Sequence, residues 1–187
     1  MSTAARHDLA DTHSIAAAGH SRKELERQFE RLLEENGPAL SRLAASYTRT
    51  TGDRDDLLQE IATALWLGLP QFRRECSERT FLFRIAHNRA ISHMSRNRGA
   101  ATVSDEAIQV SDSRPDPEAG LAQRQQQSHL LVAVQQLPVI YRETITLMLE
   151  GMSYSEIAEI LGIAESNVGA RLNRARQMLR ELLEVKK

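Results

Sequence analysis

The chain has little of what disulfide-bonded, membrane-spanning or β-rich proteins require. Its 187 residues include one cysteine, Cys76, so no intramolecular disulfide can form and a reducing compartment is favoured. No apolar run approaches the ~20 residues that span a bilayer, and the first residues lack the apolar stretch of a signal peptide. Aromatic residues make up only 4% and no strand-like alternation is sustained. These absences predict a soluble, cytoplasmic, all-α protein without a membrane segment of its own.

Recognisable patterns for catalysis or metal binding are also missing. The six histidines show no metal-ligand spacing. There is no glycine-rich phosphate loop, no nucleophile elbow and no pair of catalytic carboxylates. We therefore predict no enzymatic activity, no metal and no cofactor. A lone cysteine is more often inert than reactive, and we expect this of Cys76.

Charge is distributed unevenly, although the net charge of the chain is only −1. Residues 73–98 hold seven arginines against two glutamates, a net charge of +5. Residues 99–120 hold five acidic residues against one arginine, a net charge of −4. A local basic stretch can bind nucleic acid even when the whole chain is near neutral. The sequence therefore predicts an electropositive surface followed by an acidic connector.

Apolar periodicity divides the chain into two helical domains. Residues 1–20 hold few large apolar side chains and are predicted to be a disordered tail. Helices are predicted from about Ser21 to a break at Gly37-Pro38, from Ala39 to Thr50, around Leu57–Trp66 and over Glu78–Arg96. The predicted domains are residues 21–98 and residues 123–187, joined by a flexible acidic linker at residues 99–122.

The segment Ser153–Arg180 has the pattern of a DNA-binding helix-turn-helix. A short helix ends at Gly162, which supplies a left-handed turn, and a longer helix begins at Glu165 or Ser166. An apolar stripe on the longer helix predicts its buried face: Val168, Leu172, Ala175, Leu179 and Leu182. The outward face and its flanks offer small, amide and basic side chains that suit base edges and phosphates: Ser166, Asn167, Ala170, Arg171, Asn173, Arg174, Arg176 and Gln177.

A helical hairpin with a solvated polar face is the simpler interpretation of this segment. The position of the Gly162 turn and the short polar side chains at the centre of the exposed face favour DNA binding instead.

Several further motifs stand in a fixed order along the chain. They are Leu43-Ala-x-x-Tyr47, Asp55-Asp-Leu-x-Gln-Glu60, Phe81-Leu-Phe-Arg-Ile-Ala-x-Asn88, Leu137-Pro-x-x-Tyr-Arg142, Glu150-Gly-Met-Ser-Tyr-x-Glu-Ile-Ala-Glu-Ile-Leu-Gly162 and Arg171-Leu-x-Arg-Ala-Arg176. Each fragment alone is weakly specific. Together they resemble the extracytoplasmic-function (ECF) group of sigma-70-type RNA polymerase sigma factors, over roughly residues 22–98 and 123–183.

The resemblance implies a role for each domain. The first domain would be sigma region two and the second sigma region four, a helix-turn-helix that reads the −35 promoter element and docks on the polymerase flap. The resemblance places binding to the clamp of the largest polymerase subunit at Asp53, Asp55, Asp56, Leu57, Gln59 and Glu60. It places contacts with the −10 element at Arg73, Arg74, Thr80, Phe81, Arg84, Asn88, Arg89, Ser92, Arg96 and Arg98.

The same resemblance implies an alternative sigma factor that binds bacterial core RNA polymerase, reads and helps melt promoter DNA, and is held inactive by an anti-sigma factor. Two departures affect the residues that read DNA. Phe81 stands where the family commonly has Trp, and Asn167-Val-Gly-Ala-Arg171 stands where it commonly has Thr-Val-x-Ser-Arg. Gly169 also costs ~1 kcal/mol in a helix interior.

Two other functions fit parts of the pattern. A transcriptional regulator with an unrelated helical sensor domain would use the same helix-turn-helix, and an all-helical adaptor would bind no DNA. Neither needs the motifs at Asp55–Glu60 and Phe81–Asn88, which is why the sigma-factor interpretation is favoured.

Overall fold

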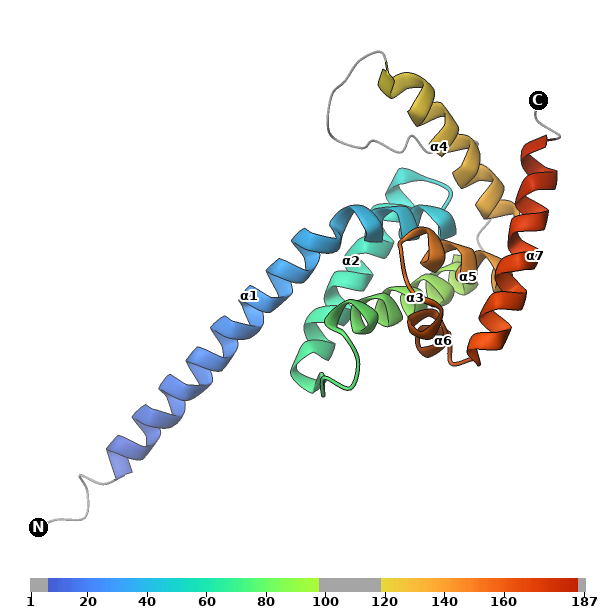
Figure 1. The fold of residues 1–187 in the computed structure, drawn as a ribbon. Helices are drawn as coiled ribbons and strands as arrows, with labels where there is room; N and C mark the ends of the chain where they lie inside the picture. The colour runs from blue at the N-terminus through green and yellow to red at the C-terminus, as the bar shows by residue number, and fades with distance from the viewer. Residues whose placement is uncertain (1–6, 98–118, 185–187) are drawn as a thin grey trace, which may run out of the picture.

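A computed structural model describes the backbone of residues 7–97 and 119–184, and the side chains of residues 22–97 and 125–184. These residues form α-helices and one 3-10 turn and contain no strand, which confirms the predicted all-α class. In chain order the helices are α1 (His7–Tyr47), α2 (Thr51–Gly68), α3 (Glu78–Asn97), α4 (Ala119–Gln136), α5 (Val139–Leu149), α6 (Tyr154–Leu161) and α7 (Glu165–Glu184). The C-terminal part of α1 packs with α2 and α3, while α4–α7 form a second group at the other end of the molecule (Figure 1).

Helix α1 is longer than predicted. It begins at His7, so the backbone of residues 7–20 is helical where we predict a disordered tail, in keeping with the high helix propensity of its alanines. It also continues through Gly37-Pro38, where we predict a break. Buried residues on both sides of the proline, such as Leu32 and Leu40, pack into one core and outweigh the cost of the missing N–H.

Helices α2 and α3 form the rest of the first core. Thr50 caps α2 by accepting a hydrogen bond from the backbone N–H of Asp53 at 3.1 Å. The buried face of α2 comprises Leu57, Ile61 and Leu65, and the aliphatic and aromatic part of the buried face of α3 comprises Leu82, Phe83, Ala86 and Ala90. These apolar faces lock the two helices against α1, so the polar faces of α2 and α3 are held in fixed positions.

The predicted helix-turn-helix is present in α6 and α7. Ser153 and Glu156 form a reciprocal capping box at the start of α6, and Gly162 ends that helix in the left-handed conformation at φ 65°. Four residues of the predicted stripe on α7 are buried, namely Val168, Leu172, Ala175 and Leu179, and Leu182 is partly buried. Because the stripe faces α4, α5 and α6, the opposite face of α7 points outward.

The two helical groups touch each other. Helix α3 packs on α6, and α1 packs on α4 and α5. The side-chain amide of Gln135 donates to the carbonyl oxygens of Ala45 and Thr48 at 2.8 and 2.9 Å. The domains therefore lie in a closed arrangement. Within the described part of the chain, no helix is both long and apolar enough to cross a membrane.

Candidate functional site

The acidic start of α2 presents most of the residues that the sequence assigns to polymerase docking. Asp55, Asp56 and Gln59 are exposed, and Asp53 and Glu60 are half-buried on the same helix. Leu57 is an exception, because its side chain is 0% exposed and packs in the core. A residue so buried cannot contact a partner in the folded protein, and Leu57 is therefore removed from the docking surface.

Glu60 is engaged within the first domain. Nη2 of Arg96 lies 2.6 Å from each carboxylate oxygen of Glu60, and Nδ1 of His93 lies 3.1 Å from Oε1. Partial burial raises the pKa of Glu60, but the hydrogen bonds from Arg96 and His93 outweigh this effect and hold the pKa below its usual range. The pair links α2 to the end of α3, two surfaces that the sequence assigns to different partners.

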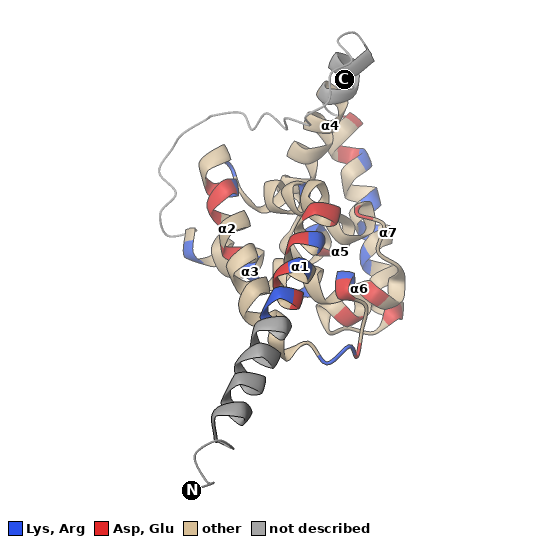
Figure 2. Cartoon of the chain, turned by 90° about the vertical axis from the view of Figure 1, so that its left-hand side faces the viewer, with Lys and Arg blue, Asp and Glu red and all other residues tan. Residues whose placement is uncertain are grey.

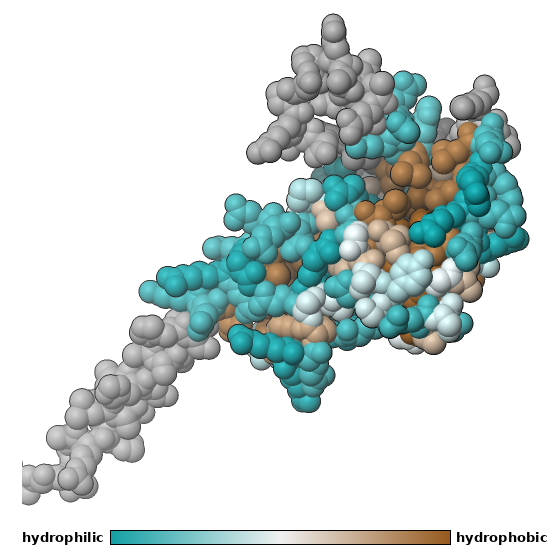
Figure 3. Space-filling view, in the orientation of Figure 1, coloured by the Kyte–Doolittle hydropathy of each residue, from teal (hydrophilic) through white to brown (hydrophobic). Residues whose placement is uncertain are grey.

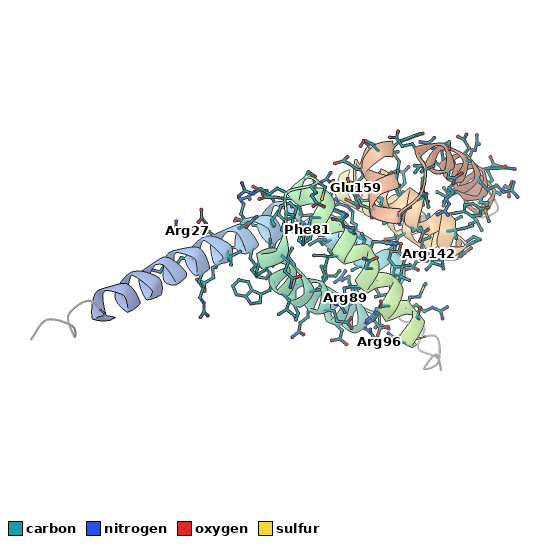
Figure 4. All side chains as sticks on the ribbon, turned by 90° about the horizontal axis from the view of Figure 1, so that it is seen from below. Arg27, Phe81, Arg89, Arg96, Arg142 and Glu159 are labelled. Atoms are coloured by element: carbon teal, nitrogen blue, oxygen red, sulfur yellow. The ribbon has the colours of Figure 1, made fainter. Side chains whose placement is uncertain are left out.

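Helix α3 carries the predicted −10 surface, and its two halves differ. Towards its C-terminal end, Asn88, Arg89, Ser92 and Arg96 are exposed along the helix, and Figure 4 shows Arg89 and Arg96 on one side of it. At its N-terminal end, Thr80 is only 1% exposed and its hydroxyl faces Glu156 of α6. Thr80 is therefore covered in the closed arrangement, contrary to its assignment as an accessible contact.

The loop before α3 supplies two more of the predicted −10 residues. Arg73 and Arg74 are exposed, and Arg74 adopts a positive φ of 58°. The ring of Phe81 packs on Phe72 with centroids 4.6 Å apart, so it is partly engaged before any base could stack on it. Phe83 is fully buried in the core. Arg98 lies outside the described residues.

The outward face of α7 presents most of the residues that the sequence assigns to the −35 element. Seven of the eight assigned residues are exposed: Ser166, Asn167, Ala170, Asn173, Arg174, Arg176 and Gln177. The eighth, Arg171, is half-buried and its Nη1 lies 2.9 Å from Oε1 of Glu143 on α5. Arg171 therefore helps to hold α7 on α5, a role that its place in the sequence did not reveal.

An apolar surface of the second domain was not predicted from the sequence. Figure 3 shows apolar surface gathered around the end of α4 and the side of α7. In this domain the side chains of Val132 on α4 and Ile140 on α5 are 39% and 48% exposed, and Leu182 and Leu183 on α7 are only partly buried. Exposed apolar surface of this kind is typical of sites that bind another protein.

Four glutamates of the second domain face the first domain. Glu150 accepts two hydrogen bonds from the guanidinium of Arg42, at 3.0 and 2.7 Å. Oε1 of Glu156 lies 3.3 Å from the hydroxyl of Thr80, and Oε1 of Glu159 lies 3.5 Å from Nη1 of Arg84. The fourth, Glu143, lies 3.7 Å from Nε2 of His87. Acidic positions on α6 are visible in Figure 2. The contact between the domains thus includes carboxylates of the second domain that face hydrogen-bond donors or a histidine of the first.

Burial controls the protonation of the groups at this contact. Burial lowers the pKa of His87 to about 4, so the imidazole is neutral at pH 7 and its contact with Glu143 is not an ion pair there. Burial raises the pKa of Glu143, against the opposing charge of Arg171. Partial burial, and after it a hydrogen bond with Glu159, raises the pKa of Cys76, so its thiol stays protonated at neutral pH.

No group of three or more histidine, cysteine or acidic residues in the described part of the chain could hold a metal ion. The arrangement of charged and amide side chains on α2, α3 and α7 suits macromolecular partners instead. The geometry therefore supports binding surfaces for protein and nucleic acid.

Comparisons with known proteins agree with this geometry. The family model for sigma-70 region 2 matches residues 32–100, and the model for sigma-70 region 4 matches residues 129–179. RNA polymerase sigma factor CnrH of Cupriavidus metallidurans is 32% identical over 168 residues, which cover 85% of this chain and 88% of the relative. This chain belongs to the ECF group of sigma-70-type sigma factors.

Other relatives place this sigma factor in the same group. ECF RNA polymerase sigma factor SigM of Mycobacterium tuberculosis is 29% identical, with 95% of this chain and 87% of the relative covered. Among solved structures, CnrH in complex with the cytosolic domain of CnrY has a TM-score of 0.65 at 27% identity, covering 87% of this chain and 91% of that one. RpoE in complex with the anti-sigma factor NepR from Bartonella quintana has a TM-score of 0.67 at 26% identity, covering 86% and 99%. The sequence-based assignment to the family is thereby confirmed.

Proposed function

We propose that this sigma factor binds core RNA polymerase through α2 and the apolar surface of its second domain. The exposed carboxylates Asp55 and Asp56, with Asp53, Gln59 and Glu60 beside them, form the surface for the clamp of the largest subunit. The apolar surface around Val132 and Ile140 suits the polymerase flap. Charged surfaces steer association and select partners, while apolar patches add affinity.

The two DNA surfaces of the proposal serve different forms of the promoter. The exposed part of α3, with Arg84 and the loop arginines, would hold the melted −10 strand by charge and hydrogen bonds. Exposed amide and guanidinium groups on α7 would read the −35 element as duplex in the major groove. The observation that carries the proposal is that one chain holds both an exposed acidic helix start in α2 and a helix-turn-helix in α6–α7.

An anti-sigma factor is the regulatory partner in this proposal. Both solved relatives named above are complexes, one with CnrY and the other with the anti-sigma factor NepR. We further propose that the protein acts in the cytoplasm and has no catalytic activity of its own. In this proposal the polymerase catalyses RNA synthesis, and the sigma factor supplies the binding energy that selects and opens the promoter.

Run-off transcription tests the proposal. Sigma-free core polymerase would be incubated with fragmented genomic DNA of the source bacterium, with and without the purified chain, and the transcript 5′ ends would be mapped. The proposal predicts a defined set of starts that depend on the added chain. Duplex binding without core binding would instead favour a transcriptional regulator, and neither activity would favour an adaptor.

A further inference from the structure

In the closed arrangement, the two proposed DNA surfaces differ in how exposed their residues are. On α7, seven of the eight residues assigned to the −35 element are exposed. On α3, Thr80 is almost fully buried and the side chain of Arg84 is 38% exposed, because α6 lies against this end of the helix. Figure 4 shows Glu159 beside the end of α3 that carries Phe81. The −35 surface is therefore open to DNA, whereas α6 covers the N-terminal end of α3 within the −10 surface.

The groups of α6 that cover α3 are anionic hydrogen-bond acceptors, as the phosphates of DNA are. Glu159 presents a carboxylate to the guanidinium of Arg84, and Glu156 presents one to the hydroxyl of Thr80. A phosphate oxygen would use the same donors. Helix α6 and its glutamates cover only the N-terminal end of α3. Asn88 and Arg89 remain exposed further along the helix.

We propose that α6 masks the part of the −10 surface at the N-terminal end of α3, so that Glu156 and Glu159 compete with single-stranded DNA for Thr80 and Arg84. This inference rests on the proposed function of α3. In the closed chain, duplex DNA can reach α7, whereas single-stranded DNA gains its full contact with α3 only after the domains separate. The second domain thus acts as an internal partner of the first.

The ion pair between α6 and α3 is weak. The side chains of Arg84 and Glu159 are 38% and 43% exposed, and ion pairs of this exposure are weak and sensitive to salt. A phosphate can therefore displace Glu159 from Arg84 at little cost in free energy. The Arg42–Glu150 pair is better shielded on one side, because the side chain of Glu150 is 4% exposed. The Arg42–Glu150 pair, the hydrogen bond from Arg79 to the carbonyl oxygen of Glu150 and a shared buried core hold the two domains together.

The test compares two double variants of the full chain. Glu156→Gln with Glu159→Gln removes both masking charges, and Gln at position 156 keeps a capping-box residue. Glu24→Gln with Glu30→Gln changes the net charge equally at exposed positions on α1. Fluorescence anisotropy would measure binding of a mixed-sequence 12-nucleotide single strand and of a 20-base-pair duplex. Small-angle scattering would report the separation of the domains.

The masking variant is expected to bind the single strand about three- to tenfold more tightly than the wild type. Duplex binding by the masking variant should stay unchanged. The α1 control should not show the gain in single-strand binding, apart from the small effect of its equally changed net charge. Adding Arg84→Ala to the masking variant should abolish the gain. An equal gain in the α1 control, or no gain in the masking variant, would overturn the inference.

A holoenzyme assay separates this inference from the function on which it rests. Transcription by core polymerase bound to the Arg84→Ala or Arg89→Ala variant of this chain reports whether α3 acts on the promoter. If these variants impair transcription but the masking variant gains no single-strand binding, masking is wrong and the proposed role of α3 stands. If they leave transcription unchanged, the proposed role of α3 fails, and masking fails with it.

Discussion

Arg96 and Glu60 join two surfaces of the first domain, because Nη2 of Arg96 lies 2.6 Å from each carboxylate oxygen of Glu60. Glu60 belongs to the acidic surface proposed for polymerase, and Arg96 belongs to the basic surface proposed for DNA. His93, which is 6% exposed, contacts the same carboxylate. Glu60 therefore holds the end of α3 against α2, whatever else it binds.

Replacement of Glu60 with Gln should lower stability as well as any partner binding. The amide carries no charge to pair with Arg96 and replaces one acceptor oxygen with an NH2 donor, and we expect a loss of about 1 kcal/mol in the free energy of unfolding. Urea unfolding measures this loss. Asp55→Asn is the matched control, since the side chain of Asp55 is 69% exposed and its change should stay within about 0.5 kcal/mol. Equal stability of the two variants would mean that Glu60 has no structural role.

Acid should destabilise the protein through His87. Its pKa is depressed from 6.5 to about 4 in the folded state, so the unfolded chain takes up the proton first as the pH falls. The contribution of His87 to stability is complete above pH 6.5 and is lost as the pH falls towards 4, with a slope approaching about 1.4 kcal/mol per pH unit.

Urea unfolding of the wild type and of His87→Gln between pH 7 and pH 4.5 measures the slope that belongs to this histidine. Glu143, which faces it, has a raised pKa and acts in the opposite direction, because its folded form gains a proton earlier than the unfolded chain. The variant should lose less stability on acidification than the wild type. Parallel curves would show that His87 is not buried in its neutral form.

Two glycines of the helix-turn-helix should respond to alanine in opposite ways. Gly169 lies inside α7, and a Cβ there would meet Cε2 of Tyr154 at 3.6 Å, an ordinary contact. Gly169→Ala should therefore stabilise the fold by up to about 1 kcal/mol. Gly162 has a φ of 65°, and Gly162→Ala should destabilise it by about 1 kcal/mol or more. Thermal unfolding checks both, and shifts in the same direction would contradict the geometry of the turn.

The outward face of α7 should carry the −35 specificity. Arg174→Ala removes an exposed guanidinium at the centre of this face and should weaken transcription from promoters found in the run-off experiment by about tenfold or more. Arg22→Ala, at a position on α1 whose side chain is 76% exposed, is the control and should have little effect. Arg171→Ala should behave differently, because it also breaks the 2.9 Å contact with Glu143 and lowers stability. An unaffected promoter preference in Arg174→Ala would exclude base readout by this residue.

The sequence predicted the second domain better than the first. The apolar stripe from Val168 to Leu179 and the turn at Gly162 are local signals, and the structure confirms both. The break expected at Gly37-Pro38 was wrong because packing on either side of the proline overrode local propensity. The burial of Leu57 follows from its place on the inner face of α2, which a motif match does not report.

The contacts between the domains could not be predicted from periodicity. Arg42 and Glu150 are 108 residues apart, and their pairing depends on how two separate helical groups meet. Periodicity shows which face of a helix is buried but not what covers it. The covering of Thr80 by α6 is a consequence of this kind, and the sequence gives no local sign of it. The assignment of individual residues to polymerase, to the −10 strand and to the −35 duplex stays a prediction.

The most direct measurement is the association of the purified full chain with sigma-free core RNA polymerase, followed by fluorescence anisotropy of the labelled chain. We predict saturable one-to-one binding that Asp55→Asn with Asp56→Asn weakens by about tenfold, while Glu24→Gln with Glu30→Gln leaves it unchanged. Failure of the wild-type chain to bind core polymerase, even if α7 still bound duplex DNA, would contradict the proposed function.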